Sequence, residues 1–181
     1  GSIAVGRNTA GAATRAGGWG HILGDEGSGY DIGRRALMAA TRFADGRGEP
    51  TLLLPRILRA WNLTAANELI GRVYHGEDKA TIAQLAPLVL QTAHEDDPAA
   101  RRIVRRAALE LALAAVTVGN RLTIHATPLP IAIGGSLLLQ DADFRAEVLR
   151  NISRHRPLGD VAVVEQPAFS AAQAAIILSS P

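Results

Sequence analysis

The residues best suited to chemistry lie in one glycine-rich stretch, residues 17–33, which reads GGWGHILGDEGSGYDIG. It combines seven glycines with an aromatic ring at Trp19 and adjacent carboxylates at Asp25 and Glu26. Glycines allow left-handed backbone dihedrals and let a ligand approach the main chain closely. An aromatic face, backbone N–H groups and a carboxylate around one concavity suit a polyhydroxylated ligand. The carboxylate would accept hydrogen bonds from hydroxyls, and the ring would cover the apolar face of a sugar.

A purely structural interpretation of the same stretch stays open, because its residues also fit a tight loop before a capped helix. Ser28 and Asp31 have the spacing of a capping box, with Asp in place of the usual Glu or Gln. Asp25 and Glu26 would also suit the positive end of the helix that follows. The residues alone therefore do not decide between ligand binding and a purely structural role.

A second candidate site is the run IAIGGSL at residues 131–137. A strand that ends in two glycines and opens onto a helix is a common geometry for the approach of a nucleotide in α/β proteins. On spacing alone, an ordinary strand-to-helix turn is favoured over a nucleotide site.

Other kinds of chemistry find little support in this sequence. The absence of cysteine excludes disulfides, thiolate metal sites and iron–sulfur clusters formed by this chain. The five histidines lack metal-ligand spacing, and Asp141 and Asp143 fit the charge expected at a helix start better than a magnesium site. No nucleophile elbow, P-loop or paired-carboxylate pattern is present.

The composition is that of an ordinary globular protein, with 181 residues, 48% of them hydrophobic and 20% charged. The formal net charge is only +2, and the one dense basic cluster consists of Arg101, Arg102, Arg105 and Arg106. Because these arginines fall on the outward arc of an amphipathic helix, we expect a solvated face rather than a nucleic-acid surface. The longest apolar stretch, residues 107–118, is interrupted by Glu110 and is too short to cross a bilayer. Without a visible signal or lipidation motif, the expectation is a cytoplasmic protein with neither membrane nor nucleic-acid partners.

The elements that must position the candidate residues begin with a hairpin, formed by strands at 2–5 and 12–16 around a turn at 8–11. After the glycine-rich stretch, apolar residues recur at helical spacing until residues 45–48 stop the helix. They are Ile32, Ala36, Ala40 and Phe43.

Three further helical segments are expected near 51–61, 64–75 and 80–94. The longest helix should run from Pro98 to about Val118, with Asp97 as its N-cap and Gly119 as its stop. Its predicted buried stripe consists of Ile103, Ala107, Leu111, Ala114 and Val118.

The remaining chain alternates between strand and helix. Strands are expected at 129–133 and 161–164, and helices at about 141–153 and 168–179. This alternation favours a parallel or mixed sheet with crossover helices.

Residues 17–33 resemble the sugar-binding loop of the N-acetylglucosamine kinase group. That group belongs to the BadF/BadG/BcrA/BcrD-type ATPases, within the actin-like superfamily of sugar kinases and heat-shock ATPases. The likeness extends over essentially the whole chain, but it covers only part of such a protein, since family members carry an earlier lobe. It implies an α/β fold, with residues 1–181 forming the C-terminal lobe of an actin-like (ribonuclease H-like) ATPase. This lobe would have a mixed sheet and an all-helical insertion at about 47–95.

The resemblance also implies which residues touch the sugar. Gly18, Trp19 and Gly20 would line a hexosamine, and Asp25 would accept hydrogen bonds from its hydroxyls. Ser2, with Ile3, falls where the phosphate loop of the family meets the sugar, so that the first half of this loop is expected upstream of Gly1. Glu26 is expected to support the loop rather than to touch the substrate.

On the nucleotide side, the resemblance implies that the backbone at Gly134 and Gly135 passes against ATP, and that Ser136 bonds to ribose or phosphate. The family usually shows a Gly-Ala pair in the last helix near the nucleotide. This chain reads Gln173-Ala174-Ala175 there, without the glycine, and so departs from the family pattern.

The activity implied is that of the C-terminal part of an ATP-dependent hexosamine kinase, with ATP and Mg²⁺ as cofactors. The γ-phosphate would pass to the 6-hydroxyl of N-acetylglucosamine or glucosamine. The resemblance places the aspartate base and the first phosphate loop in the earlier lobe, so no catalytic residue is expected in this chain, and the chain alone should not turn over.

Two alternatives stay open. Activating ATPases of acyl-CoA dehydratases and reductases share the superfamily fold, but they use cysteine-ligated iron–sulfur clusters, which this chain cannot form. A non-catalytic module for sugar binding or regulation would keep the loop without the base. A lobe without its partner exposes apolar surface, which is compatible with a homodimer.

Overall fold

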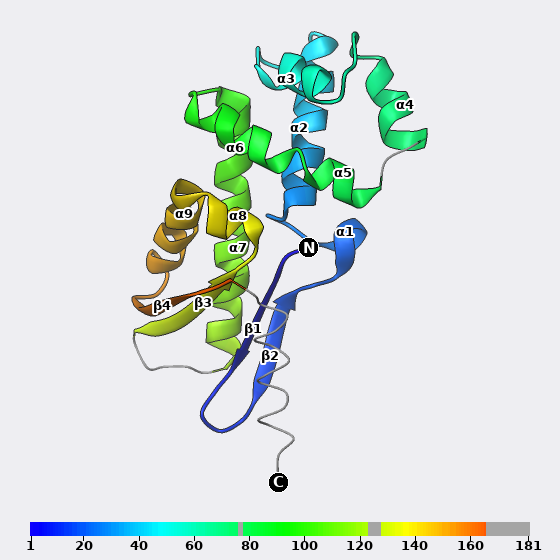
Figure 1. Cartoon of the computed structure of the whole chain (residues 1–181). Coiled ribbons are helices and arrows are strands. Elements are labelled where there is room, and N and C mark those ends of the chain that lie inside the picture. The colour runs from blue at the N-terminus through cyan, green and yellow to red at the C-terminus, as the bar shows by residue number, and fades with distance from the viewer. Residues whose placement is uncertain (76–77, 123–127, 166–181) are drawn as a thin grey trace.

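The computed structural model describes residues 1–75, 78–122 and 128–165 (Figure 1). Its elements in chain order are β1 (Ile3–Arg7), β2 (Ala13–Gly17), α1 (Gly20–Leu23), α2 (Gly29–Ala44), α3 (Leu53–Ala60), α4 (Glu68–His75), α5 (Lys79–Ala83), α6 (Ala86–His94), α7 (Pro98–Arg121), β3 (Leu129–Gly134), α8 (Ser136–Gln140), α9 (Ala142–Ser153) and β4 (Leu158–Val164).

The predicted hairpin is confirmed: β1 and β2 pair antiparallel, from Ile3 opposite Gly17 to Arg7 opposite Ala13. One face of the hairpin packs on α7, where a β-carbon at Gly6 would lie 2.6 Å from Val118 Cγ1. The opposite face is exposed, with Val5 70% accessible. Because glycine lies against α7 at this point, the hairpin can lie close to the helix.

The 24-residue helix α7 is the central helix, and the elements that pack against it are β1, β2, α2, α6 and α9 (Figure 1). It starts as predicted, with the Asp97 carboxylate accepting from the Ala100 N–H at 2.9 Å and with Pro98 in the first turn. The prediction that Gly119 stops the helix is wrong, since α7 continues to Arg121. Gly119 instead packs against Leu129, which a β-carbon would approach to 3.3 Å. Its small size brings β3 close to the helix.

The buried surface of α7 is wider than the single stripe predicted. Ile103, Ala107 and Val118 are buried, but Leu111 and Ala114 are only half-buried. Residues between them share the burial, because helices and both strands of the hairpin pack around α7; these residues are Ala108, Ala112 and Val116.

Among its described residues, the helical segment between α2 and α7 contains four helices rather than three. The predicted helix at 80–94 is divided into α5 and α6, with a turn between them. Pro87 explains the break, because its ring clashes with the carbonyl four residues earlier and it lacks an N–H to donate. That carbonyl belongs to Ala83, the last residue of α5.

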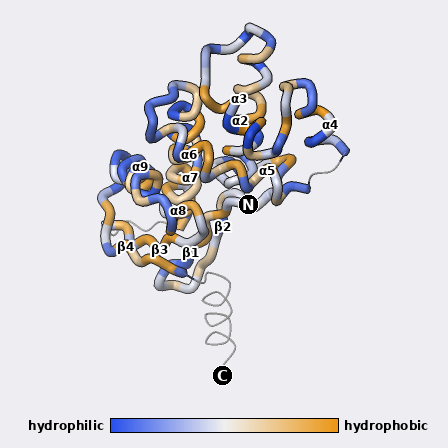
Figure 2. The backbone as a smooth tube through the Cα atoms, turned by 45° about the horizontal axis from the view of Figure 1, so that its top comes forward, coloured by the Kyte–Doolittle hydropathy of each residue, from blue (hydrophilic) through white to orange (hydrophobic). Residues whose placement is uncertain are grey.

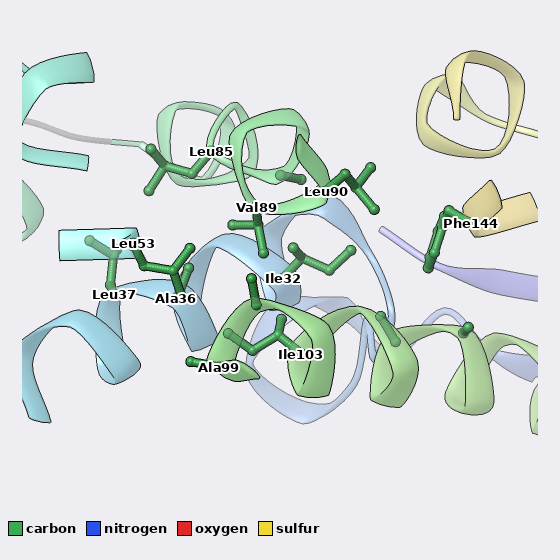
Figure 3. Close-up of a cluster of buried hydrophobic side chains, with 14 of the residues drawn as sticks. Ile32, Ala36, Leu37, Leu53, Leu85, Val89, Leu90, Ala99, Ile103 and Phe144 are labelled. Atoms are coloured by element: carbon green, nitrogen blue, oxygen red, sulfur yellow. The ribbon is translucent and has the colours of Figure 1, made fainter. Parts of the chain in front are cut away.

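The main core lies where α2, α3, α6 and α7 meet. Ile32, Leu53, Ile57 and Val89 are fully buried there, and Figure 3 shows Ile32 and Val89 facing one another with Ile103 of α7 beside them. Figure 2 shows hydrophobic residues concentrated at these meeting points. Among the described helices, none combines the length and apolarity that crossing a membrane requires.

The last described part is a β–α–β unit. Strands β3 and β4 pair in parallel, with α8 and α9 forming the crossover. As predicted, Phe144, Val148 and Ile152 form the buried face of α9. Strand β4 starts at Leu158, three residues before the predicted start at Val161, and α8 was not anticipated as a separate helix.

Both parallel and antiparallel pairing occur, but within the described residues they form two separate two-stranded sheets. The expected mixed α/β class is confirmed, but each of these two sheets is smaller than the single mixed sheet that was expected. The helix predicted at 168–179, which includes Gln173, Ala174 and Ala175, lies outside the described residues.

Candidate functional site

The glycine-rich loop turns the chain from β2 into the short helix α1. Gly17, Gly18 and Gly20 all have positive φ, at 76°, 71° and 81°. These values favour glycine because other residues meet steric strain there. A β-carbon at Gly18 would also lie 2.8 Å from Ile3 Cδ1, so the loop runs directly against the start of β1.

Ser2 ties the two ends of this loop together. Its backbone N–H donates to Asp25 Oδ1 at 3.2 Å, and its carbonyl accepts from the Gly18 N–H at 2.9 Å. Its hydroxyl donates to the carbonyl oxygen of Glu26 at 2.7 Å. The structure therefore brings Ser2, Gly18 and Asp25 together, three residues of the predicted sugar side.

Asp25 is the central charged group of the loop. It is only 3% exposed and has a φ of 61°, unusual for a residue other than glycine. Lys79, on α5, donates from Nζ to Asp25 Oδ2 at 2.6 Å. Burial raises the pKa of Asp25, but hydrogen bonds from Lys79 and from the Ser2 N–H outweigh it and lower that pKa below its usual range. The group is thus an ionised acceptor at neutral pH.

Trp19 presents its ring to solvent. It is 65% exposed, and the Arg15 guanidinium lies 5.1 Å from the ring centroid. On α1, which follows Trp19, Ile22 and Leu23 are 84% and 77% exposed. An accessible indole next to the buried carboxylate loop has the character expected for covering a sugar face.

Glu26, Ser28 and Asp31 hold the loop in different ways. Glu26 supports it through its main-chain carbonyl, which accepts from Ser2, while its side chain is exposed. The predicted cap at Ser28 is confirmed, since its Oγ accepts from the Asp31 N–H at 3.2 Å. The Asp31 carboxylate does not return to the Ser28 N–H; it accepts from the Gly27 N–H at 3.2 Å and from Arg35 Nε at 2.9 Å.

Asp31 is therefore a positioning residue whose wider role the sequence analysis missed. Its carboxylate is buried and joins the loop to the first turn of α2. The signal available was the arginine four residues later, since pairs at this spacing meet on one helix face.

Gly27 fixes the far end of the loop on α7. A β-carbon there would lie 2.6 Å from the Ala107 carbonyl oxygen and 2.8 Å from Leu111 Cγ. Glycine is thus required both by this close approach and by a φ of 77°.

The predicted nucleotide side lies at the carboxyl end of β3. Gly134 ends the strand, Gly135 has a φ of 105°, and Ser136 begins α8. Gly135 and Ser136 are exposed, and among the described residues no atom beyond the chain neighbours of Gly135 lies within 4 Å of where its β-carbon would stand. Within the described residues, no hydrogen bond or ion pair joins this strand end to the sugar-side residues.

Carboxylates and histidines elsewhere have structural roles. Asp141 caps α9 by accepting from the Phe144 N–H at 2.8 Å, as its position at a helix start predicts. His94 Nε2 lies 3.0 Å from the same carboxylate, and this hydrogen bond raises the pKa of His94. Across the described ranges, no three His, Asp or Glu side chains gather as a metal-ligand set.

Comparisons with known proteins identify kinases to which this chain is similar. An N-acetylmuramic acid/N-acetylglucosamine kinase from Clostridium acetobutylicum is 40% identical over 139 residues, which are 76% of this chain and 45% of that protein. An N-acetyl-D-glucosamine kinase from Dictyostelium discoideum is 36% identical over 110 residues, or 60% of this chain and 34% of that protein. The chain thus spans less than half the length of these curated relatives.

The solved structures show the same fold over most of this chain. A candidate N-acetylglucosamine kinase from Chromobacterium violaceum superposes with a TM-score of 0.68 at 28% identity, covering 97% of this chain and 55% of that one. A second, from Porphyromonas gingivalis, gives a TM-score of 0.64 at 26% identity, covering 90% of this chain and 52% of that one. The fold class expected from the resemblance is confirmed.

The family itself is matched along nearly the entire sequence. A model of the BadF/BadG/BcrA/BcrD ATPase family covers residues 1–178. This chain belongs to the BadF/BadG/BcrA/BcrD ATPase family.

Proposed function

We propose that this chain is the C-terminal part of an ATP-dependent hexosamine kinase that transfers the γ-phosphate of ATP to the 6-hydroxyl of N-acetylglucosamine or glucosamine. The family and the kinases among its relatives support this proposal. The structural observation that carries it is Asp25, an ionised carboxylate held on the same glycine-rich loop that carries the exposed ring of Trp19.

On the sugar side, Asp25 accepts from the hydroxyls and Trp19 covers the apolar face of the ring. A carboxylate offers about four acceptor positions, and the Ser2 N–H and Lys79 occupy two of them. Ser2 is fixed in the backbone at the start of β1, whereas the Lys79 side chain is 38% exposed on a flexible stem. A sugar hydroxyl would use one of the acceptor positions of the Asp25 carboxylate that Lys79 and the Ser2 N–H leave free, so that Lys79 stays in place as the counter-charge.

On the nucleotide side, Gly134, Gly135 and Ser136 would hold ATP, which supplies the phosphoryl group. The fit is supported by the exposure of Gly135, since no side chain among the described residues lies within 4 Å of where its β-carbon would stand. Mg²⁺ is usually bound by one or two carboxylates together with the phosphates of the nucleotide, so it does not require the three-residue cluster that the described residues lack. We assign no residue of this chain to the metal.

No residue of this chain is proposed as the base that accepts the proton of the 6-hydroxyl. We place that role in the part of the relatives that this chain does not span. The second candidate function is a sugar-binding module without catalysis, which is favoured by the presence of the predicted sugar-side residues without an assigned base.

Isothermal titration with N-acetylglucosamine, glucosamine, N-acetylmuramic acid and glucose tests the sugar side. It is made on this chain and on a version extended upstream to the length of the relatives. Asp25→Asn keeps the side-chain volume and removes the charge, and should weaken hexosamine binding by the extended form about tenfold or more. Asp45→Asn, at an exposed carboxylate at the end of α2, is the matched control and should leave binding unchanged.

A coupled ATPase and sugar-phosphorylation assay separates the two candidate functions. Turnover by the extended form and none by this chain agrees with the kinase proposal, and sugar binding without turnover by either form favours the binding module. Robust phosphorylation by this chain alone would contradict our placement of the base. If neither form binds a sugar, the proposal for residues 17–33 is wrong.

A further inference from the structure

A groove between α2 and α7 gathers six arginines around an apolar floor. Its volume is about 490 Å³. Three arginines come from α2 and three from α7: Arg34, Arg35, Arg42, Arg102, Arg105 and Arg106. Met38 and Ile103 lie between them, and Figure 3 shows Ile103 and Ala99 on the side of α7 that approaches α2.

The sequence could show only half of this groove. Arg102, Arg105 and Arg106 form the outward arc of α7, which was expected to be a solvated face, and Arg102 and Arg106 are indeed exposed. The arginines of α2 precede them by sixty positions or more and reach the same groove only through helix packing. Two solvated faces thereby become the two walls of one basic concavity.

Carboxylates compensate some of these guanidinium groups and hold them in place. Asp31 pairs with Arg34 at 3.3 Å and with Arg35 at 2.9 Å. Arg102 pairs with Glu49, and Arg106 pairs with Glu110 at 3.0 Å. Four arginines therefore line the walls in positions set by three carboxylates of the protein.

Arg42 and Arg105 are different. Within residues 1–75, 78–122 and 128–165, neither makes an ion pair or a side-chain hydrogen bond. Both line the groove, one from each wall. An arginine fork is a strong, bidentate donor for phosphate, which suits a dianion between the walls.

We propose that this groove binds a small organic phosphate, with Arg42 and Arg105 holding the phosphate and the apolar part of the ligand resting on Met38 and Ile103. The volume lies within the range of small-molecule sites, about 300–1,000 Å³. Methionine adapts to ligands of varied shape, which suits a floor for an apolar group. The inference does not depend on the proposed function, because none of its residues belongs to the sugar or nucleotide side.

Charge and shape argue against larger occupants. A second copy of the chain would place the same arginines opposite each other in a two-fold contact, which is repulsive. The groove has no aromatic side chain on which nucleic-acid bases could stack, and the chain as a whole carries a net charge of only +2.

Fluorescence titration of the 181-residue chain with 1-naphthyl phosphate is the test, with 1-naphthol and inorganic phosphate as ligand controls. The double variant Arg42→Gln/Arg105→Gln removes the two unpaired guanidinium groups. Arg7→Gln/Arg59→Gln, at exposed arginines on β1 and α3, changes the net charge equally and is the matched control.

We expect saturable binding of one 1-naphthyl phosphate that is weakened at least about tenfold in the groove variant and unchanged in the control, with 1-naphthol binding less than the phosphate. The ligand should also protect Arg42 and Arg105 from phenylglyoxal, as mapped by mass spectrometry. If both double variants weakened binding of the naphthyl phosphate equally, net charge alone would explain the effect, and the proposal would be overturned. Absence of binding would also overturn the proposal. If hexaglutamate displaced the naphthyl phosphate at a lower concentration than inorganic tripolyphosphate does, the proposal would be overturned in favour of an acidic protein partner.

Discussion

Replacing Asp97 by alanine should destabilise the chain much more than the loss of a helix cap alone. Asp97 is 5% exposed and stands at the N-terminus of α7, where it accepts from the Ala100 N–H at 2.9 Å. The same carboxylate accepts from the Thr51 hydroxyl at 2.9 Å and from the Leu52 N–H at 2.7 Å. One side chain therefore joins the start of α7 to the start of α3.

The expected free-energy change follows from what each partner loses. Removing an N-cap aspartate costs about 1 kcal/mol. Leaving a buried hydroxyl or N–H without its acceptor costs about 1–3 kcal/mol for each group, and Thr51 is itself buried. For Asp97→Ala, we expect a loss of about 3–5 kcal/mol in the free energy of unfolding.

Asp78→Ala provides the matched control. Asp78 caps α5 by accepting from the Thr81 N–H at 3.0 Å, but it is exposed, and within the described residues its side chain accepts hydrogen bonds from Thr81 alone. It should lose about 1 kcal/mol or less. Asp97→Asn keeps one capping oxygen and should fall between the two alanine variants.

Urea unfolding, followed by circular dichroism at 222 nm, measures these differences through the midpoint and the slope. Equal losses for Asp97→Ala and Asp78→Ala would refute the reasoning, because they would leave nothing for the long-range bonds to Thr51 and Leu52. If Asp97→Ala were the only variant to change the slope of the free energy of unfolding against urea concentration, the result would point to a change in cooperativity rather than to the lost hydrogen bonds.

Two further predictions test the packing of the helical segment. At Gly33, a β-carbon would collide with the backbone carbonyl of Ile82, so Gly33→Ala should cost about 1–3 kcal/mol although alanine favours helices. Gly71→Ala, in open space on α4, should instead raise the free energy of unfolding by up to about 1 kcal/mol. Urea unfolding of both variants measures these changes, and a Gly33→Ala variant of unchanged stability would disprove the close contact with Ile82. The hydrogen bond to Asp141 raises the pKa of His94 above its ordinary 6.5, so its stabilisation is complete below pH 6.5 and is lost as the pH rises through the folded-state pKa. His94→Gln should therefore lower the thermal midpoint more at pH 5.5 than at pH 8.5, and equal losses at both would contradict the ion pair.

Local signals in the sequence were sufficient for most elements. The Asp-Pro pair at the start of α7 and the serine cap of α2 were found from spacing, because capping depends on residues within one turn. The errors came from tertiary packing. Gly119 has the chemistry of a helix stop, but the contact with Leu129 uses its small size inside the helix instead.

The sugar side was predictable as a loop but not as a set of contacts. The glycines and Asp25 stand close together in the sequence, and their spacing alone indicated a concavity. The three hydrogen bonds of Ser2 were not predictable, because they depend on how β1 pairs with β2 and where the loop returns. The groove between α2 and α7 was hidden for the same reason, since neither basic helix face is unusual by itself.

Lys79 shows why the helical segment cannot be treated as separate from the sugar loop. It is the sole lysine of the chain and lies 54 residues from Asp25, so no local pattern links the two. A carboxylate that is only 3% exposed is costly to ionise unless a counter-charge is provided. Since α5 provides that charge, and Gly33 allows α5 to pack against α2, the position of the helical segment contributes to keeping the residue proposed to bind sugar ionised. The helical segment is therefore coupled to the candidate site, and changes in its packing should affect Asp25 first.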